Sequence, residues 1–294
     1  MKKIAENITL GVIGGSGLYE MPGLENIREL EIQTPFGNPS TPIVVGTMEG
    51  QQVAFLARHG RGHFLSPSEV NYRANIYSLK MLGVKQILSI NACGSLREDF
   101  SPGHIVIPDQ VFDFTRSRPR TFFGDGLVAH ISTADPFCPH LSSAVAGAVQ
   151  QAGGIVHNGG TIVVIEGPRF STKAESNAFR SWGMSIIGMT CAPEVFLARE
   201  AECCYSVMAH VTDYDVWHLS EESVSVEVVV ETLNRNTLLA REAIHLLLKQ
   251  LPSTSGCGCE TALSGAIITN PKAIPPNTRS KLDLLVNKYL PPSG

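Results

Sequence analysis

The chain has 294 residues, of which 43% are hydrophobic and 17% are charged, and its formal net charge is −4. This length can bury one large α/β core or two small ones, and the composition is ordinary for a globular enzyme. The sequence shows no basic tract with interleaved aromatics, no signal-peptide h-region and no apolar run that could cross a bilayer. We therefore expect no nucleic-acid partner, no membrane and a cytoplasmic location.

Three strands are predicted near the start of the chain. Apolar and β-branched runs over 8–15, 41–48 and 51–58 have the length and composition of strands. Glu49 and Gly50 separate the second run from the third, so these two runs are predicted to form a hairpin.

A helix and a buried strand come next. The helix is predicted over 66–83, because Ser66 or Ser68 can cap it and Pro67 suits its first turn. The strand follows over 84–95. This strand–helix–strand order favours a parallel pair of strands with a right-handed crossover.

In the rest of the chain, segments with the pattern of a strand continue to alternate with segments that have the pattern of a helix. Further strands are predicted over 103–114, 160–168, 185–189 and 205–215. Further helices are predicted over 172–182, 193–204, 225–251 and 275–290, with a linker over 252–265. No internal repeat is visible, so one α/β domain with a mostly parallel or mixed sheet is the economical prediction.

The glycine-rich segment "VIGGSGLYE" (residues 12–20) follows the first strand. A dinucleotide-binding turn needs a third glycine that opens a helix, but Glu20 stands at that position and Met21 to Gly23 form a poor helix start. A turn with exposed backbone N–H groups and the Ser16 hydroxyl suits a single phosphate. A tight turn without a ligand fits the same residues.

A basic segment follows the third strand. Arg58, His59, Arg61 and His63 fall within six residues. Arginine binds phosphate oxygens as a planar fork and histidine adds a donor, so the segment indicates an anion site. A solvated charged face is the alternative.

An acidic pair ends the strand predicted over 205–215. Asp213 and Asp215 lie two residues apart, so their side chains point the same way on an extended chain. The two carboxylates repel unless they share a proton or a ligand donates to them. A solvated turn is one interpretation. A hard metal ion is another, although no nearby residue completes its ligand set. Recognition of a base with an amino group and a ring nitrogen is the third.

Three other segments also follow predicted strands. Residues 91–96 offer backbone N–H groups in a small-residue turn, and Phe170 can stack on an aromatic ring. Met189 and Thr190 lie at the start of the next helix, where an anion is favoured. Each signal is weak alone, because a buried Phe or Met is usually a core residue.

The chain has seven cysteines, two of which form the C-x-C pair Cys257 and Cys259. A zinc site would need a second ligand pair at suitable spacing, and no clean pair is visible. The sequence is compatible with free thiols in a loop. It is also compatible with a disulfide within the C-x-C pair, or with pairing to Cys203 or Cys204.

Taken together, eight segments resemble the trimer-forming branch of the purine nucleoside phosphorylase superfamily. They are "GVIGGSGL", "TPFGNPS", "LARHGRGH", "PSEVNYRANI", "ACGSL", "IEGPRFST", "MTCAPEV" and "TDYDVW". The resemblance implies a single α/β domain over 1–294, with a central mixed, partly barrel-like sheet flanked by helices and with 252–294 docked as a C-terminal extension. It also implies a homo-oligomer, a trimer or a dimer of trimers, with the site near a subunit interface. In heat-adapted relatives, cysteines in such an extension form disulfide bridges.

The resemblance also implies a role for each candidate residue. Phosphate would be held by Ser16, Arg58, His59, the backbone N–H of Ala92, and Thr190. The nucleoside would contact Phe170, Ser171, Met189, Asp213, Asp215, Val226, Val229 and, from a neighbouring subunit, His130. Asp213, Arg58 and His59 would be catalytic. Inorganic phosphate would be a co-substrate, and no metal or other cofactor is expected. Ser16 and Asn91 stand where many relatives have Thr, and Ser keeps the hydroxyl.

The implied reaction is phosphorolysis of a purine nucleoside. A carboxylic acid at Asp213 could protonate the purine near N7, and a carboxylate accepts from an exocyclic amino group. We therefore expect a preference for 6-aminopurines, and the resemblance implies conversion of 5′-methylthioadenosine to adenine and 5-methylthioribose 1-phosphate in purine and methionine salvage, with adenosine as a second substrate. The alternatives are a 6-oxopurine nucleoside phosphorylase, a nucleosidase that uses water, and a binding module without catalysis.

Overall fold

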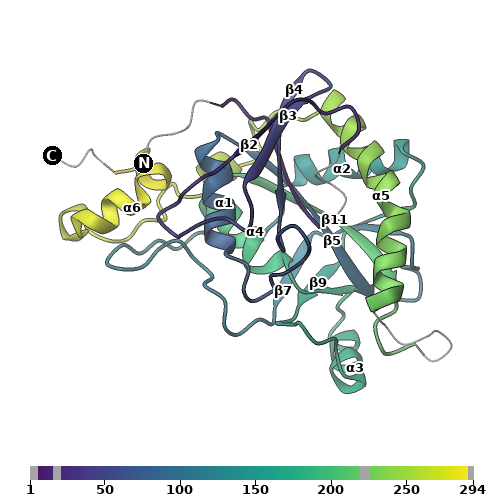
Figure 1. Cartoon of the computed structure of the whole chain (residues 1–294). Coiled ribbons are helices and arrows are strands. Elements are labelled where there is room, and N and C mark those ends of the chain that lie inside the picture. The colour runs from purple at the N-terminus through teal and green to yellow at the C-terminus, as the bar shows by residue number, and fades with distance from the viewer. Residues whose placement is uncertain (1–5, 16–20, 219–225, 291–294) are drawn as a thin grey trace.

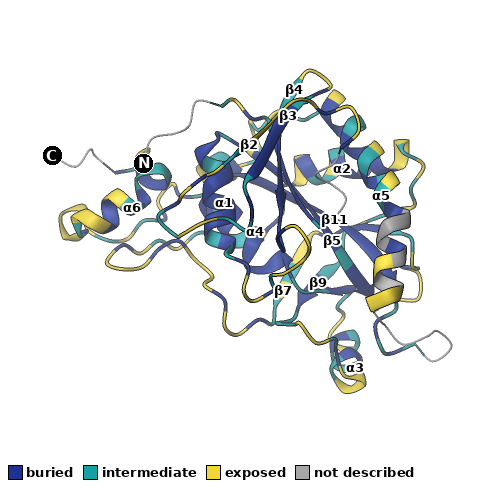
Figure 2. Ribbon diagram, in the orientation of Figure 1, coloured by how far each residue is buried: buried dark blue, intermediate teal, exposed yellow. Residues whose placement is uncertain are grey.

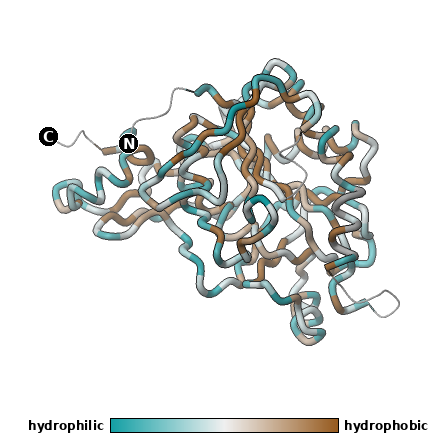
Figure 3. The backbone as a smooth tube through the Cα atoms, in the orientation of Figure 1, coloured by the Kyte–Doolittle hydropathy of each residue, from teal (hydrophilic) through white to brown (hydrophobic). Residues whose placement is uncertain are grey.

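The computed structural model describes residues 6–15, 21–218 and 226–290 (Figure 1). A mixed β-sheet forms its centre and helices cover both faces, which confirms the predicted α/β class. Buried residues are concentrated on the central strands, and the same strands are the most hydrophobic part of the chain (Figures 2 and 3). In the described part of the chain, no helix is both long and apolar enough to span a bilayer.

The sheet contains eleven strands. In chain order they are β1 (Leu10–Gly14), β2 (Glu25–Leu30), β3 (Ile43–Met48), β4 (Gln51–Ala57), β5 (Gln86–Ser95), β6 (Ile105–Ile107), β7 (Gln110–Asp113), β8 (Val156–Asn158), β9 (Thr161–Val164), β10 (Ile186–Gly188) and β11 (Cys204–Asp213). Strand β1 lies between β4 and β5 and runs parallel to both, so the predicted parallel crossover is confirmed. Strands β3 and β4 form the predicted antiparallel hairpin.

Part of the sheet curls back on itself beyond β5. Strand β5 pairs with β1 at its start, with β10 at its end and with β11 along most of its length. Strand β11 pairs with β6, and Pro108 and Asp109 join β6 to β7. Strand β7 pairs with β9, which pairs with β10. This path returns to β5, so the sheet is partly barrel-like, as predicted.

Two groups of helices bury the two faces of the sheet. The helices are α1 (Tyr72–Met81), α2 (Pro139–Gln151), α3 (Lys173–Ser181), α4 (Cys191–Glu200), α5 (Val226–Lys249) and α6 (Pro276–Val286). Helices α1, α4 and α6 share one hydrophobic core, whereas α2 and α5 share another (Figure 1). Every residue of β11 is buried, because both of its faces are covered.

Helix α1 begins later than the sequence predicts. Its N-cap is Asn71, whose side chain accepts a hydrogen bond from the backbone N–H of Ala74. The predicted cap region, 66–70, forms turns, in which Glu69 accepts from Ser66. Serine and asparagine are comparable caps, so the local sequence could not distinguish the two starts.

The predicted linker, 252–265, packs closely on the body. Cys259 and Leu263 are buried, one in each of the two main cores. Further along, Ile267 forms a bridge with Ala129. Apolar side chains therefore hold this segment in place. The boundary of a C-terminal extension at residue 252 stays a prediction.

Candidate active site

Arg58, the first of the predicted anion-binding residues, lies at the end of β4 beside the end of β1. Its backbone N–H donates to the carbonyl of Gly14 at 3.0 Å. Its guanidinium forms a buried two-point ion pair with Glu194 of α4, with Nε–Oε2 and Nη2–Oε1 distances of 2.9 and 3.0 Å. The contact joins two segments that are far apart in the sequence.

Most donors of Arg58 are already occupied. Besides the pair with Glu194, Nη2 donates to Ser89 Oγ at 2.6 Å and Nη1 donates to the Ile90 carbonyl at 3.2 Å. One N–H of Nη1 is left over by these contacts. Burial acts to lower the pKa of Arg58, but the adjacent Glu194 carboxylate outweighs it, so the pKa is raised and the side chain stays charged.

Glu194 is a site residue that the sequence analysis missed. It is fully buried, and it accepts hydrogen bonds from Ser89 Oγ at 2.7 Å and Tyr205 OH at 2.8 Å in addition to those of Arg58. The only signal in the sequence is a carboxylate near the start of an apolar helix. That position usually indicates favourable interaction with the helix dipole, not an ion pair.

Asn91 and Thr190 lie beside this ion pair. Asn91 Oδ1 accepts from Ser89 Oγ at 3.2 Å and from Thr190 Oγ1 at 3.4 Å, and Thr190 is the N-cap of α4. Asn91 Nδ2 is buried and has no hydrogen-bond partner among the described residues. Ala92 follows on β5 and is half-buried. A buried amide donor without a partner is rare, and a helix N-terminus attracts anions.

His59 is buried as a neutral imidazole. Its Nδ1 donates to the Leu65 carbonyl at 2.9 Å, and its ring stacks on His63 with the centroids 4.3 Å apart. Burial and the charge of Arg58 lower the pKa of His59 to about 4. Near neutral pH, its Nε2 therefore carries a lone pair and acts as an acceptor.

The acidic pair is buried at the end of β11. Asp213 Oδ2 accepts from Thr212 Oγ1 at 2.6 Å, and Oδ1 accepts from the backbone N–H of Asp215 at 2.7 Å. Burial raises the pKa of Asp213 to about 6 and also raises the pKa of Asp215. The bond from the Asp215 N–H to Asp213 Oδ1 is that of an Asx turn, so the turn considered above is present, but it is buried and not solvated.

Gly94 of β5 makes room for this pair. It lies opposite Asp213 in the sheet, at a β-bulge in β11. A Cβ atom at Gly94 would lie 2.9 Å from Asp213 Oδ1 and 3.2 Å from the Cβ of Asp215. The glycine in "ACGSL" therefore permits the close approach of the carboxyl groups to the backbone of β5.

Two serine hydroxyls lie beside the acidic pair. Burial raises the pKa of Asp215, whereas Ser176 and Ser171 act to lower it, so both hydroxyls lie close to its carboxyl group, although no hydrogen bond of regular geometry joins Asp215 Oδ2, Ser171 Oγ and Ser176 Oγ in the described part of the chain. Ser171 precedes α3, and Thr172 caps this helix through a capping box with Glu175. A buried group of hydroxyls and carboxyls whose mutual hydrogen bonds are poorly formed can rearrange around a polar ligand.

The sequence analysis also missed Arg118, which ties two loops of the site together. This buried guanidinium donates to the carbonyls of Met189, Ala192 and Glu166 at 2.6, 2.8 and 2.6 Å. Phe170 and Met189, predicted as substrate contacts, are both half-buried and belong to these loops. Arg118 lies in a polar segment outside any predicted element, so no sequence signal singled it out.

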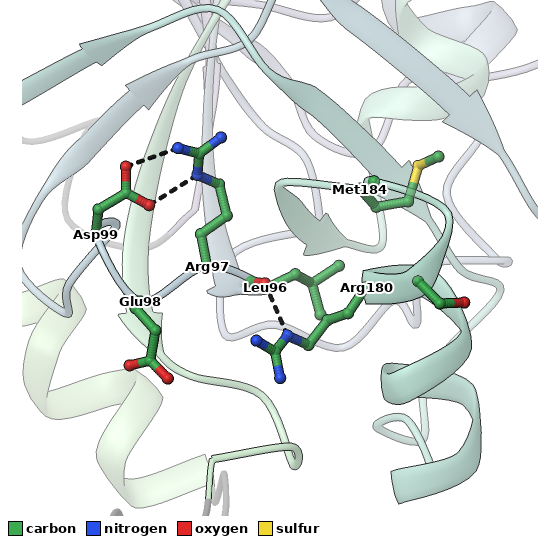
Figure 4. A pocket seen from close by; sticks show the side chains of 8 residues that line it. Leu96, Arg97, Glu98, Asp99, Arg180 and Met184 are labelled. Atoms are coloured by element: carbon green, nitrogen blue, oxygen red, sulfur yellow. Dashed lines mark hydrogen bonds and ion pairs between the residues drawn. The ribbon is translucent and has the colours of Figure 1, made fainter.

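One depression in the described surface lies away from both groups of residues. It has a volume of about 550 Å³ and lies beyond the end of β5, with a lining of Leu96, Arg97, Glu98, Asp99, Arg180, Ser181, Gly183 and Met184. Figure 4 shows Arg97 paired with Asp99 at its edge and Arg180 directed at the Leu96 carbonyl. Its lining in the described structure includes none of the predicted site residues, so we do not assign the site to it.

Of the remaining predicted residues, two have side chains that are not described and two are exposed. Ser16 lies outside the described residues, as does the side chain of Val229. Val226 is exposed at the first residue of α5. His130 is exposed and lines a separate surface pocket with Phe196 and Glu200. Its predicted contribution to a neighbouring subunit stays a prediction.

The buried groups form two clusters along β5. The anion cluster consists of Arg58, Glu194, Ser89, Asn91 and Thr190. The acid cluster consists of Asp213, Asp215, Ser171 and Ser176. Asn91 and Gly94, which anchor the two clusters on β5, are three residues apart, which is about 10 Å on a strand. This spacing can accommodate a ligand with an anionic end and a hydrogen-bonding heterocycle.

Comparison with known proteins agrees with this geometry. The family model described as the phosphorylase superfamily matches residues 9–249. The S-methyl-5′-thioadenosine phosphorylase of Geobacter sulfurreducens is 52% identical over 282 residues, which cover 96% of this chain and 99% of that protein. The protein of the same name from Chloroflexus aurantiacus is 51% identical, with 96% and 98% of the two chains covered.

Two solved structures of methylthioadenosine phosphorylases are also similar to this chain. A methylthioadenosine phosphorylase from an antarctic soil metagenomic library superposes with a TM-score of 0.88 at 46% identity, and 95% of this chain and 99% of that chain are covered. A mutant of the adenosine/methylthioadenosine phosphorylase from Schistosoma mansoni, in complex with methylthioadenosine, has a TM-score of 0.81 at 35% identity, with 88% and 98% covered. With the anion and acid clusters in place and similarity over nearly its whole length, this chain belongs to the phosphorylase superfamily.

Proposed function

We propose that this protein catalyses the phosphorolysis of 5′-methylthioadenosine to adenine and 5-methylthioribose 1-phosphate. The observation that carries the proposal is the pair of buried polar clusters beside β5, one with the amide donor of Asn91, which has no partner among the described residues, and one with the buried carboxyl groups of Asp213 and Asp215. Relatives at 52% and 51% identity are named S-methyl-5′-thioadenosine phosphorylases, which supports this choice of substrate. Adenosine is proposed as a second substrate.

At the anion cluster, phosphate is proposed to bind between Asn91, Thr190 and Arg58. Asn91 Nδ2 and the remaining N–H of Arg58 can donate to phosphate oxygens, and the Thr190 hydroxyl lies beside Asn91. The Ala92 backbone and Ser16 are proposed to complete the site. Neutral His59 can accept a hydrogen bond from the P–OH of hydrogen phosphate and so orient the attacking oxygen.

At the acid cluster, the purine is proposed to lie against Asp213 and Asp215. Cleavage of the glycosidic bond places negative charge on the purine and positive charge on the ribose. Because the pKa of Asp213 is raised to about 6, its carboxyl group holds a proton more readily than a solvated one and can donate it near N7. The other oxygen of the Asp213 carboxyl group can accept from the 6-amino group, and Asp215 lies beside it.

The remaining contacts belong to the same proposal. Phe170 and Ser171 would line the base pocket, and Met189 would lie against the ribose. His130, Val226 and Val229 would surround the 5′ substituent, with His130 supplied by a neighbouring subunit. The proposal also includes a homo-oligomer, either a trimer or a dimer of trimers, and a cytoplasmic location. The reaction is proposed to need no cofactor other than the phosphate substrate.

A coupled assay of adenine release tests this function. We expect release from 5′-methylthioadenosine only when phosphate is present, with inosine turned over at least about 100-fold more slowly, because a site built for an amino group leaves polar groups unpaired with a 6-oxopurine. Equal release without phosphate would instead identify a nucleosidase. No release under either condition would identify a binding module.

A further inference from the structure

The structure brings together four cysteines that are widely separated in the sequence. The Sγ atoms of Cys138, Cys204, Cys257 and Cys259 all lie within 4.8 Å of one another, and the Sγ atoms of Cys204 and Cys257 are 3.4 Å apart. We call this group the thiol cluster. From it we infer that the protein has a structural site for one Zn²⁺ ion held by four thiolates, a site separate from the proposed catalytic function.

The geometry of the thiol cluster fits this ion. Zinc binds four sulfurs at about 2.3 Å, so neighbouring sulfurs in a regular tetrahedron are about 3.8 Å apart. A disulfide would require a sulfur pair at about 2.05 Å, whereas all seven cysteines are free thiols in the structure. Four sulfurs mutually within 4.8 Å surround one point, which two separate disulfides do not require.

Fixed backbone positions present the four thiols. The backbone N–H of Cys138 donates to the Tyr205 carbonyl at 2.9 Å, and that of Cys204 donates to the Lys85 carbonyl at 2.8 Å. Gly258 separates the other two cysteines with a φ of +74°, which lets the short C-x-C segment turn both thiols toward one point. The sequence analysis found no second ligand pair for Cys257 and Cys259, because Cys138 and Cys204 reach them only in the folded chain.

The surroundings favour the negative charge of the complex. Binding of Zn²⁺ by four thiols releases four protons and leaves a net charge of −2. Arg199 Nη1 lies 3.3 Å from Cys259 Sγ, and Cys138 is the N-cap of α2, so a cation and a helix N-terminus both face the cluster. Three of the four cysteines are buried and the fourth is half-buried, so the site is closed as structural zinc sites are.

The position of the cluster separates it from catalysis. Cys204 begins β11 and Asp213 ends it, about 30 Å further along the strand. The ion would instead join the segment after α5 to α2 and to the start of β11. We therefore expect the metal to stabilise the fold and to take no part in the proposed reaction.

Metal analysis of the full-length protein, purified under reducing conditions without a metal-binding tag, tests the inference. We expect about one zinc per chain, and after exchange with Co²⁺ the visible absorption of a tetrahedral thiolate site. The Cys257→Ser variant should lose most of the zinc and its Tm should fall by about 5 °C or more. Cys203→Ser is the matched control, because Cys203 packs in the opposite core and contacts the Val84 carbonyl at 3.4 Å. This variant should keep its zinc.

A second measurement does not depend on a variant: the wild type is purified without reductant, and its free thiols are counted after denaturation. Seven free thiols before reduction, together with one zinc, would support the site. Three free thiols and no metal would overturn it in favour of two disulfides. Seven free thiols and no metal, even after incubation of the reduced protein with Zn²⁺, would overturn it as well.

Discussion

The Asp213→Asn variant should lower kcat for 5′-methylthioadenosine by about 100- to 10,000-fold, because an amide cannot protonate the leaving purine. The variant should also gain activity on inosine relative to the wild type, since an amide donates to a 6-oxo group. Steady-state rates on both nucleosides at saturating phosphate measure the two effects. An unchanged preference for 5′-methylthioadenosine with a full rate would refute the assignment of Asp213.

The raised pKa of Asp213 adds a pH test. In the wild type, kcat/KM for 5′-methylthioadenosine should fall about tenfold per pH unit above about pH 6, as the carboxyl group ionises. In the Asp213→Asn variant, kcat/KM should not show this decrease above about pH 6. Stability follows the same titration: the contribution of the protonated group is complete below about pH 3.8 and is lost as the pH rises through about 6. The wild type should therefore lose stability relative to the variant over that interval and stay level above it.

The Glu194→Gln variant should lower the free energy of unfolding by about 3–5 kcal/mol, because it leaves the buried Arg58 guanidinium without its counter-ion. Ser89 and Tyr205 lose a charged acceptor in the same change. Since Arg58 is also proposed to hold phosphate, the KM for phosphate should rise. Urea denaturation and phosphate titration of the rate measure the two effects.

The Glu29→Gln variant provides the matched control. Glu29 pairs with Arg61 at 2.6 Å, but both side chains are about half exposed, with relative exposures of 50% and 47%. Exposed ion pairs contribute only about 0–1 kcal/mol, so this variant should keep nearly all of its stability and its KM for phosphate. If Glu194→Gln proved no more damaging than Glu29→Gln, the buried pair would not organise the anion site.

The fold was predictable where apolar residues set the pattern. The hairpin of β3 and β4, the buried strand β5 and helix α3 all have clear apolar runs or caps. Strand β2 was missed because it is an edge strand with five exposed residues out of six, so it shows no alternation. Helix α2 was missed because small residues (serine, alanine and glycine) are frequent in its sequence, so its apolar periodicity is weak.

The candidate site was only partly predictable for a related reason. Arg58, Asp213 and Asp215 could be identified because charged residues follow apolar strands. Their partners Glu194 and Arg118 come from other segments, and a single sequence does not show which distant groups meet in the interior. The thiol cluster could not be predicted for the same reason. Its four cysteines come together only when α2, β11 and the segment after α5 pack against one another.

The central claim is that one substrate spans the anion and acid clusters on β5. A crystal structure with 5′-methylthioadenosine and sulfate, which occupies the place of phosphate, tests it most directly. We predict sulfate within hydrogen-bond distance of Asn91 Nδ2 and Thr190, and the adenine amino group and N7 against the carboxyl groups of Asp213 and Asp215. Sulfate bound in the depression lined by Leu96 and Arg180, or an adenine turned away from both carboxyl groups, would contradict the account.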